Sequence, residues 1–312
     1  MGVWLNKNFI EISNATAKPG TMLERYSYKD IDEEYIDAVV NDEKIKWIQI
    51  SDSLPNEAYT VIDSILSRKP DLYFRIYGLY TDDKFDISFL ERMPHLNKLR
   101  IDCHLRSCPD MIDFNILTKL DLKALHLDAF DLRDYGFLQS LSEKLEELVI
   151  NADTMGGAIK FDCKWLLRYN SLKSLWIGKK AKKNIKFIAE LPKLESLSLR
   201  GIKLSDFDFL KQMNLRELRL LWNSNNDLEE LKYLTTLKEI ELWRINKLNN
   251  IDFISMLTNL EVIRLQDLKH VTKLPDLSEL HNLKKIVLDN TGIEIENLDI
   301  DLRDKIELFN FK

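Results

Sequence analysis

The chain has 312 residues and a formal net charge of −6, from 45 Lys and Arg residues against 51 Asp and Glu residues. Hydrophobic residues make up 45% of it and charged residues 31%, the proportions of a soluble globular chain with enough apolar mass for a long core. A nucleic-acid-binding protein usually has a basic balance or one strongly basic face, so this charge disfavours that class.

Nothing in the chain resembles an export or membrane signal. The N-terminus lacks the basic head and the long apolar core of a secretory signal. No apolar run approaches the ~20 residues that a membrane helix requires. There are 3 cysteines, and an odd number is unlike a secreted disulfide framework. We therefore expect a cytoplasmic protein.

Residues 1–44 contain no internal repeat. Apolar residues near the start predict one or two short strands, and they are Trp4, Leu5, Phe9, Ile10 and Ile12. Asp30, followed by Glu33 three residues later, opens an apolar pattern at helical spacing, which predicts a capped amphipathic helix. We interpret this region as an N-terminal capping segment, because the end of a repeat array must be covered.

From residue 45 onward one phrase, apolar-x-x-apolar-x-apolar, recurs at nearly fixed spacing. Its clearest part runs from Leu172 to Leu288, and it starts at positions 45, 74, 96, 122, 145, 172, 194, 215, 237, 260, 283 and 306. Two of its less regular copies are Phe74-x-x-Tyr77-x-Leu79 and Ile306-x-x-Phe309-x-Phe311. The pattern predicts twelve turns, each with one short strand whose apolar residues point inward. The long first spacing predicts a helix that contains Ala58, Val61, Ile62, Ile65 and Leu66.

An apolar phrase of this kind, repeated every 20 to 29 residues, is typical of leucine-rich repeats, and the chain resembles that superfamily. Its period near 22, and phrases such as Phe207-Asp-Phe-Leu210, are similar to the short bacterial type that includes internalin-like and phosphatase-regulator proteins. That type usually has an Asn three residues after the last apolar strand position, which is Asn223 here. The equivalents in other turns are Ile202, Ile245, Leu268 and Thr291.

The resemblance implies an α/β fold, a horseshoe-shaped leucine-rich repeat solenoid over residues 45–312. A parallel sheet of about 12 strands would line its concave side, with short helices or turns on the convex side. We expect one elongated domain, because each turn of a solenoid buries its core only against its neighbours.

The residues between the apolar strand positions face the predicted concave side, because side chains alternate across a strand. The residues after the leading positions are charged, with opposite charges on most neighbouring strands, and they predict a charge ladder along the sheet edge: Lys173, Glu195, Arg216, Lys238, Glu261 and Lys284. Trp and Arg gather in the columns beyond it, and both are enriched where binding energy concentrates. We predict a partner-binding site from Trp176, Arg200, Arg219, Trp222, Trp243 and Arg264.

A structural interpretation of these columns competes with the functional one. Glu241 would then neutralise Arg219 and Arg264 as a charge ladder, and the Trp rings would pack on neighbouring side-chain stems. Toward the N-terminus the same face is smaller and more acidic, and it offers Tyr80, Arg100, Asp102, His126, Asp128 and Asn151. A partner that spans the whole face would meet a cationic aromatic centre and an acidic flank.

These features predict a non-catalytic scaffold for protein–protein interaction, in a bacterial cytoplasm. Such a scaffold could be an inhibitor or immunity-type neutraliser of a toxin or effector, or it could be a regulatory adaptor. The residues do not distinguish these two functions. The alternative is a nucleic-acid or phosphate-ligand binding module, in which Arg200, Arg219 and Arg264 contact phosphates while Trp176 and Trp243 stack on bases.

Catalytic and metal motifs are missing from the sequence. It holds no phosphate loop, dinucleotide fingerprint, zinc-protease helix or nucleophile elbow. Cys103, His104, Cys108 and Asp110 lie close together but lack the spacing of a zinc site. We expect no enzymatic activity, no metal and no cofactor.

The last predicted strand, Ile306 to Phe311, lies at the end of the repeats with no evident cap. Unpaired backbone groups at a sheet edge are available for pairing with another chain, so self-association through this strand is one expectation. The other is a tolerated edge protected by its charged residues.

Overall fold

The computed structural model describes residues 8–16, 25–79, 83–225, 227–294, 298 and 300–308. The chain divides into two compact units, residues 1–161 and 162–312, and the strands of each unit pair in parallel. The predicted boundary between a capping segment, 1–44, and a solenoid, 45–312, differs from this division and stays a prediction.

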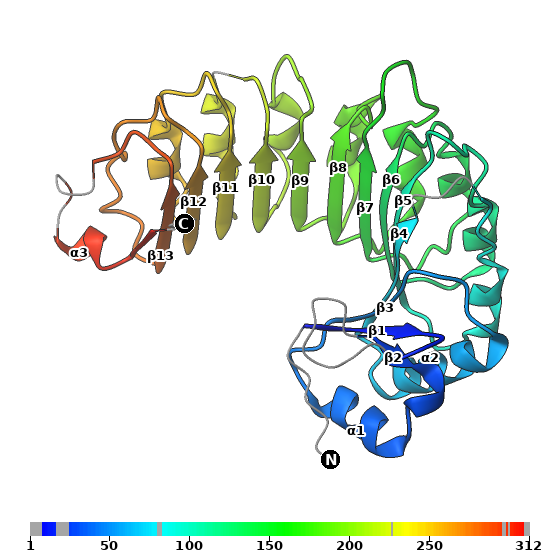
Figure 1. Cartoon of the computed structure of the whole chain (residues 1–312). Coiled ribbons are helices and arrows are strands. Elements are labelled where there is room, and N and C mark those ends of the chain that lie inside the picture. The colour runs from blue at the N-terminus through cyan, green and yellow to red at the C-terminus, as the bar shows by residue number, and fades with distance from the viewer. Residues whose placement is uncertain are drawn as a thin grey trace. The chain divides into compact units, whose positions relative to one another are not determined.

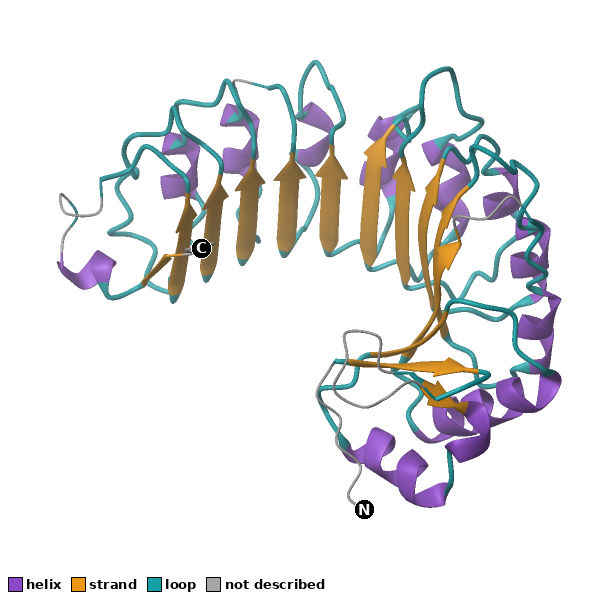
Figure 2. Ribbon diagram, in the orientation of Figure 1, coloured by secondary structure: helices purple, strands orange, loops and turns teal. Residues whose placement is uncertain are grey.

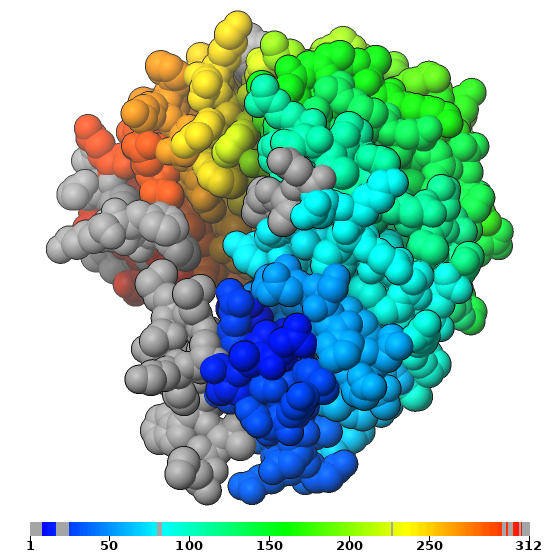
Figure 3. All heavy atoms as spheres, turned by 45° about the vertical axis from the view of Figure 1, so that its right-hand side comes forward, coloured from blue at the N-terminus to red at the C-terminus, as the bar shows by residue number. Residues whose placement is uncertain are grey.

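Unit 1 has the strand order β2-β1-β3-β4-β5-β6-β7 (Figure 1). Its strands are β1 (Phe9–Ser13), β2 (Tyr26–Ser27), β3 (Trp47–Ile50), β4 (Tyr73–Leu79), β5 (Lys98–His104), β6 (Ala124–Phe130) and β7 (Glu147–Ala152). Its helices are α1 (Glu33–Asn41) and α2 (Asn56–Arg68), with 3-10 helices η1 (Tyr28–Asp30), η2 (Ser88–Arg92), η3 (Phe114–Lys119) and η4 (Gly136–Gln139). Figure 3 shows the surface of the N-terminal part of unit 1 in blue.

Unit 2 runs in strand order from β8 to β14. Its strands are β8 (Ser174–Lys179), β9 (Ser196–Arg200), β10 (Glu217–Leu221), β11 (Glu239–Trp243), β12 (Val262–Gln266), β13 (Lys285–Asp289) and β14 (Ile306–Leu308). Short helices connect them: η5 (Cys163–Arg168), η6 (Ile185–Glu190), η7 (Asp208–Leu210), η8 (Glu229–Tyr233), η9 (Asp252–Met256) and α3 (Ile300–Arg303). The 3-10 helices lie on one side of the sheet (Figure 2).

One turn shows why the repeats fold in this way. Leu215, Leu218 and Leu220 are fully buried, whereas Glu217 and Arg219 between them are half-buried on the other face. Leu218 is in register with Leu197 of the preceding strand and Ile240 of the following one. Burying each such side chain contributes about 1.5–3 kcal/mol, and a turn does this only by stacking on its neighbours. The predicted leucine-rich repeat solenoid is confirmed, with the twelve turns supplying β3 to β14.

The predicted position of the phrase is wrong in two turns. Phe74 is in register with Ile48 and Leu99, the second apolar residues of their turns, so it is not a leading residue. Phe74 and Ile76 take the inward positions, and Tyr77, predicted to point inward, is 40% exposed.

The same shift occurs in the last turn. Ile306 pairs with Ile286, which is again a second apolar position. Phe309 and Phe311 lie outside the described residues. Self-association through β14 stays a prediction.

The N-terminal segment contains the predicted strand and helix. β1 includes Phe9, while Trp4 and Leu5 lie outside the described residues. The helix α1 is capped by Asp32, whose carboxylate accepts a hydrogen bond of 2.9 Å from the Tyr35 N–H, and not by Asp30 as the spacing predicts. The helix predicted in the first long spacing is α2. No described helix is long and apolar enough to cross a membrane.

Asn223 has the structural role that its position predicts. It is 4% exposed, and its Oδ1 accepts a hydrogen bond of 3.2 Å from the Ile202 N–H of the preceding turn. The equivalents Ile202, Ile245 and Leu268 are buried apolar residues. In these turns a buried apolar side chain therefore replaces the asparagine and its hydrogen bond to the preceding turn.

Candidate functional site

The open face of unit 2 is the face of its sheet that is turned away from the 3-10 helices, and it corresponds to the predicted concave face. Trp176, Arg219 and Arg264 share one column across β8, β10 and β12. Arg200 and Trp243 share the next column, on β9 and β11. All five, and Trp222 just after β10, are half-buried.

Two of the predicted arginines are already paired with carboxylates. The Arg219 guanidinium forms an ion pair with Glu217, and its Nε lies 3.5 Å from Glu241. Arg264 Nε donates a hydrogen bond of 2.9 Å to Glu239. Three carboxylates thus surround two cations, so this part of the face is not cationic.

The pKa of Glu241 is raised above its ordinary value. Its burial is the largest cause and outweighs the charges of Arg219 and Arg264, which lower the pKa. Because Arg219 Nε is buried and forms no hydrogen bond within the described part of the chain, Glu241 acts on it through charge alone.

Glu217 and Glu239 were not among the predicted site residues. They occupy the strand position directly before the second apolar residue of each turn, and they are in register with each other. Strand alternation places this position on the open face, so the signal was present in the repeat. The column of Glu217 and Glu239 contains the counter-ions of Arg219 and Arg264.

A second group centres on the Trp222 ring at the ends of the strands. The Trp243 ring meets it edge to face, with the ring centroids 5.6 Å apart. The guanidinium carbons of Arg200 and Arg244 lie 4.4 and 5.3 Å from the ring centroid, and Lys179 Nζ lies 5.5 Å from it. Each cation–π contact contributes ~0.5–1 kcal/mol at such sites. Three cations therefore gather around one aromatic ring, which we call the Trp222 cluster.

The backbone fixes Trp222 in this place. Its φ of 58° lies in the left-handed region, which bulky residues rarely adopt. A residue with positive φ ends β8 or directly follows each strand from β9 to β13: Lys179, Gly201, Trp222, Arg244, Asp267 and Asn290. The Trp222 N–H donates a hydrogen bond of 2.7 Å to the Trp243 carbonyl, and the Arg244 N–H donates one of 2.9 Å to Gln266. The repeat thus imposes the conformation of Trp222.

Members of the Trp222 cluster differ in how well their polar groups are satisfied. Trp243 Nε1 donates a hydrogen bond of 3.0 Å to Asp267, and Arg244 pairs with the same carboxylate at 2.9 Å. The Arg200 side chain has no ion pair or hydrogen bond among the described residues, and it contacts the Trp222 ring. Trp222 Nε1 is buried without a hydrogen-bond partner in that same part of the chain.

The six predicted residues therefore separate into groups. Arg200, Trp222 and Trp243 are in contact, whereas Arg219 and Arg264 belong to the glutamate-paired group. Trp176 joins neither group in the described contacts. The predicted site is thus brought together only in part.

The predicted charge ladder is confirmed along the edge of the sheet. Arg216 Nε lies 3.5 Å from Glu195, and Lys238 and Lys284 each place Nζ 2.6 Å from a Glu261 oxygen. Hydrogen bonds from Lys238 and Lys284 hold the pKa of Glu261 at about 2.

The face of unit 1 is paired internally as well. Asp102, part of the predicted acidic flank, forms ion pairs with Arg75 and with Arg100, the latter at 3.0 Å. Glu147 accepts a hydrogen bond of 2.6 Å from the Tyr73 hydroxyl. Neither residue was among the predicted site residues. Tyr80, predicted for this flank, lies outside the described residues.

No protein-family model and no curated protein sequence matches the chain. Solved structures similar to it include an internalin (inlF) of Listeria monocytogenes, 19% identical with a TM-score of 0.46, covering 89% of this chain and 83% of that one. Internalin C2 (inlC2) of the same organism is 17% identical, with a TM-score of 0.40 over 88% of this chain and 90% of that one. A leucine-rich repeat protein of Leptospira interrogans is 16% identical, with a TM-score of 0.43 over 90% and 92% of the two chains.

The repeats and the strand register of this chain define a leucine-rich repeat fold. The likeness to the three solved structures assigns it no partner.

The left-handed backbone at Trp222 predicts an unusual order of variant stabilities. Trp222→Gly should be more stable than Trp222→Ala by about 1 kcal/mol, because only glycine adopts a positive φ without a Cβ penalty. At Trp243, which lies within β11, Gly should instead be less stable than Ala by about 0.5–1 kcal/mol. Urea unfolding of the four variants measures both differences. An alanine variant at 222 that equals or exceeds the glycine variant would contradict the described backbone.

The depressed pKa of Glu261 predicts a pH-dependent contribution to stability. The contribution is complete above pH 4.5, the ordinary pKa of the group, and is lost as the pH falls toward the folded-state pKa of about 2. The difference in unfolding free energy between wild type and Glu261→Gln should therefore shrink from pH 5 to pH 2. Urea titrations at several pH values measure it, with Glu279→Gln, a change at an exposed carboxylate, as the control. A difference that does not vary with pH would contradict the ladder geometry.

Proposed function

We propose that this chain is a non-catalytic scaffold that binds a partner protein on the open face of unit 2. The predicted binding residues are Trp176, Arg200, Arg219, Trp222, Trp243 and Arg264. The observation that carries the proposal is the Arg200–Trp222 pair, in which a guanidinium that has no carboxylate partner among the described residues lies 4.4 Å from a half-buried ring. Trp and Arg are the residues in which interface binding energy concentrates.

The rigidity of this surface supports the proposal. The strands below it are in continuous register, and their inward residues, such as Leu218 and Ile240, are fully buried. Backbone hydrogen bonds hold Trp222 at its strand end. A preformed surface of this kind loses little conformational entropy on binding, so more of the contact energy appears as affinity.

The glutamate-paired group contributes in a different way. Arg219 and Arg264 already interact with Glu217, Glu239 and Glu241, so a partner carboxylate gains little from approaching them. Alternating charges of this kind favour selective association over affinity. We therefore assign the affinity to the Trp222 cluster and the selectivity to the glutamate-paired group.

The same pairing disfavours the nucleic-acid alternative. Two of the three arginines predicted to contact phosphate, Arg219 and Arg264, face carboxylates that would repel a phosphate backbone. Phosphate contacts would also make binding fall steeply with the logarithm of salt concentration. A protein partner does not require such a dependence.

Inhibition is one form that this scaffold takes in our proposal. A rigid surface that covers the active surface of a toxin or effector neutralises it without any chemistry of its own. The captured partner would then lose its activity when the scaffold is added, whereas the partner of a regulatory adaptor would keep it.

The test is capture of partners from a lysate of the source organism by wild type and by an Arg200→Ala, Trp222→Gly variant. A matched control is Lys211→Ala, Tyr233→Ala, which removes a cation–aromatic contact of 5.3 Å away from the open face. We expect one protein to be retained by wild type and by the control, and the Arg200, Trp222 variant to raise its Kd by about 30-fold, as for a hot spot of 2 kcal/mol. Retention by the open-face variant together with loss by the control would place the binding surface elsewhere and overturn the proposal.

A further inference from the structure

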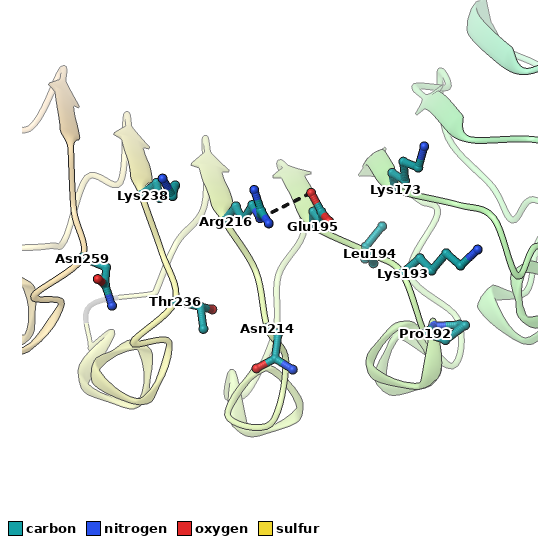
Figure 4. Close-up of a pocket in the computed structure, with 10 residues that line it drawn as sticks. All are labelled: Lys173, Pro192, Lys193, Leu194, Glu195, Asn214, Arg216, Thr236, Lys238 and Asn259. Carbon is teal, nitrogen blue, oxygen red and sulfur yellow. Dashed lines mark ion pairs between the residues drawn. The ribbon is translucent and has the colours of Figure 1, made fainter.

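A groove of 680 Å³ runs along the edge of the unit 2 sheet where the strands begin (Figure 4). It shares no residue with the predicted binding site, whose Trp222 cluster lies where the strands end. Its walls include Lys173, Lys193, Glu195, Asn214, Arg216 and Lys238. It is therefore a second surface, separate from the proposed binding face.

The groove is basic in a chain whose net charge is −6. Among the described residues, four cationic side chains and the carboxylate of Glu195 line it, and one of the cations, Lys238, is paired at 2.6 Å with Glu261. The pair between Arg216 and Glu195 is 3.5 Å long, and both side chains are more than half exposed, so it is weak. Lys193 forms no ion pair among the described residues. Lys193 and the weakly paired Arg216 thus offer cationic charge to a ligand.

Polar side chains repeat along the groove. Asn214, Thr236 and Asn259 take the same place in three successive turns, each directly before a leading apolar residue. The Thr236 hydroxyl donates a hydrogen bond of 2.7 Å to the Leu215 carbonyl, and Asn259 Nδ2 donates one of 2.8 Å to Thr235. Asn214 has no hydrogen bond from its side chain in the described part of the chain. Its amide therefore has both a donor and an acceptor for the backbone of a ligand.

The dimensions of the groove fit a short extended peptide. It extends from the turn of Lys173 to the turn of Asn259, which is four inter-strand spacings. At about 4.8 Å each, these span roughly 19 Å, and an extended chain that rises ~3.3 Å per residue covers this with about six residues.

We propose that this groove binds an extended acidic polypeptide segment of about six residues. Its carboxylates meet Lys193 and Arg216, and its backbone meets the Asn214 amide. A peptide fits better than a nucleic acid because no aromatic ring of the described residues lines the groove to stack a base, and because Glu195 lies among the cations. The proposal does not depend on the partner of the open face.

The test is fluorescence anisotropy with a labelled hexaglutamate peptide at 0.15 M salt, the ionic strength at which surface charges are physiologically screened. A hexaglutamine peptide of the same length is the neutral control. We expect binding of hexaglutamate only, and at least a tenfold weaker Kd for the Lys193→Glu, Arg216→Glu variant. Lys247→Glu, Lys273→Glu carries the same net charge at exposed positions outside the groove and should stay within about twofold of wild type.

The other outcomes decide against the proposal. Equal loss in the groove variant and the control variant would show a general charge effect without a groove site. Tighter binding of a six-nucleotide thymidine oligonucleotide than of hexaglutamate would indicate a nucleic-acid groove. Absence of hexaglutamate binding to wild type would overturn the proposal directly, and none of these results bears on the open face.

Discussion

A single repeat turn has too little apolar surface to bury its own leucines, and this constraint fixes the arrangement within each unit. Leu218 is covered only because Leu197 and Ile240 lie in register on either side of it. Register in turn aligns the outward residues into columns, so that charges and rings of successive strands come into contact. It also places a left-handed residue at the end of each strand from β8 to β13, among them Trp222.

The cations of the open face differ in whether a carboxylate already pairs with them. Glutamates of the face neutralise Arg219 and Arg264, and Asp267 neutralises Arg244. Arg200 is different, because it lies against an aromatic ring and has no carboxylate partner in the described part of the chain. The positions of the counter-ions, more than those of the cations, therefore identify the proposed anchor for a partner.

The repeat period was enough to predict the number of strands in the solenoid, because apolar spacing and stacking express the same constraint. The register of β4 was not predictable, since Phe74 and Ile76 fit the apolar pattern as well as Phe74 and Tyr77 do. The group around Trp222 was predictable only in part. Its residue types are visible in the sequence, but the left-handed backbone that brings Lys179, Arg200 and Arg244 to one ring follows from turn geometry, which residue propensities do not encode.

The central claim is that the Trp222 cluster forms the contact with the partner protein. Hydroxyl-radical footprinting of the complex with the captured partner tests it most directly, because oxidation rates report the solvent access of each aromatic side chain. We expect Trp222 and Trp243 to be oxidised more slowly in the complex, while Tyr233, which is 52% exposed on η8, is oxidised at the same rate. Slower oxidation of Tyr233 with unchanged rates at Trp222 and Trp243 would contradict it.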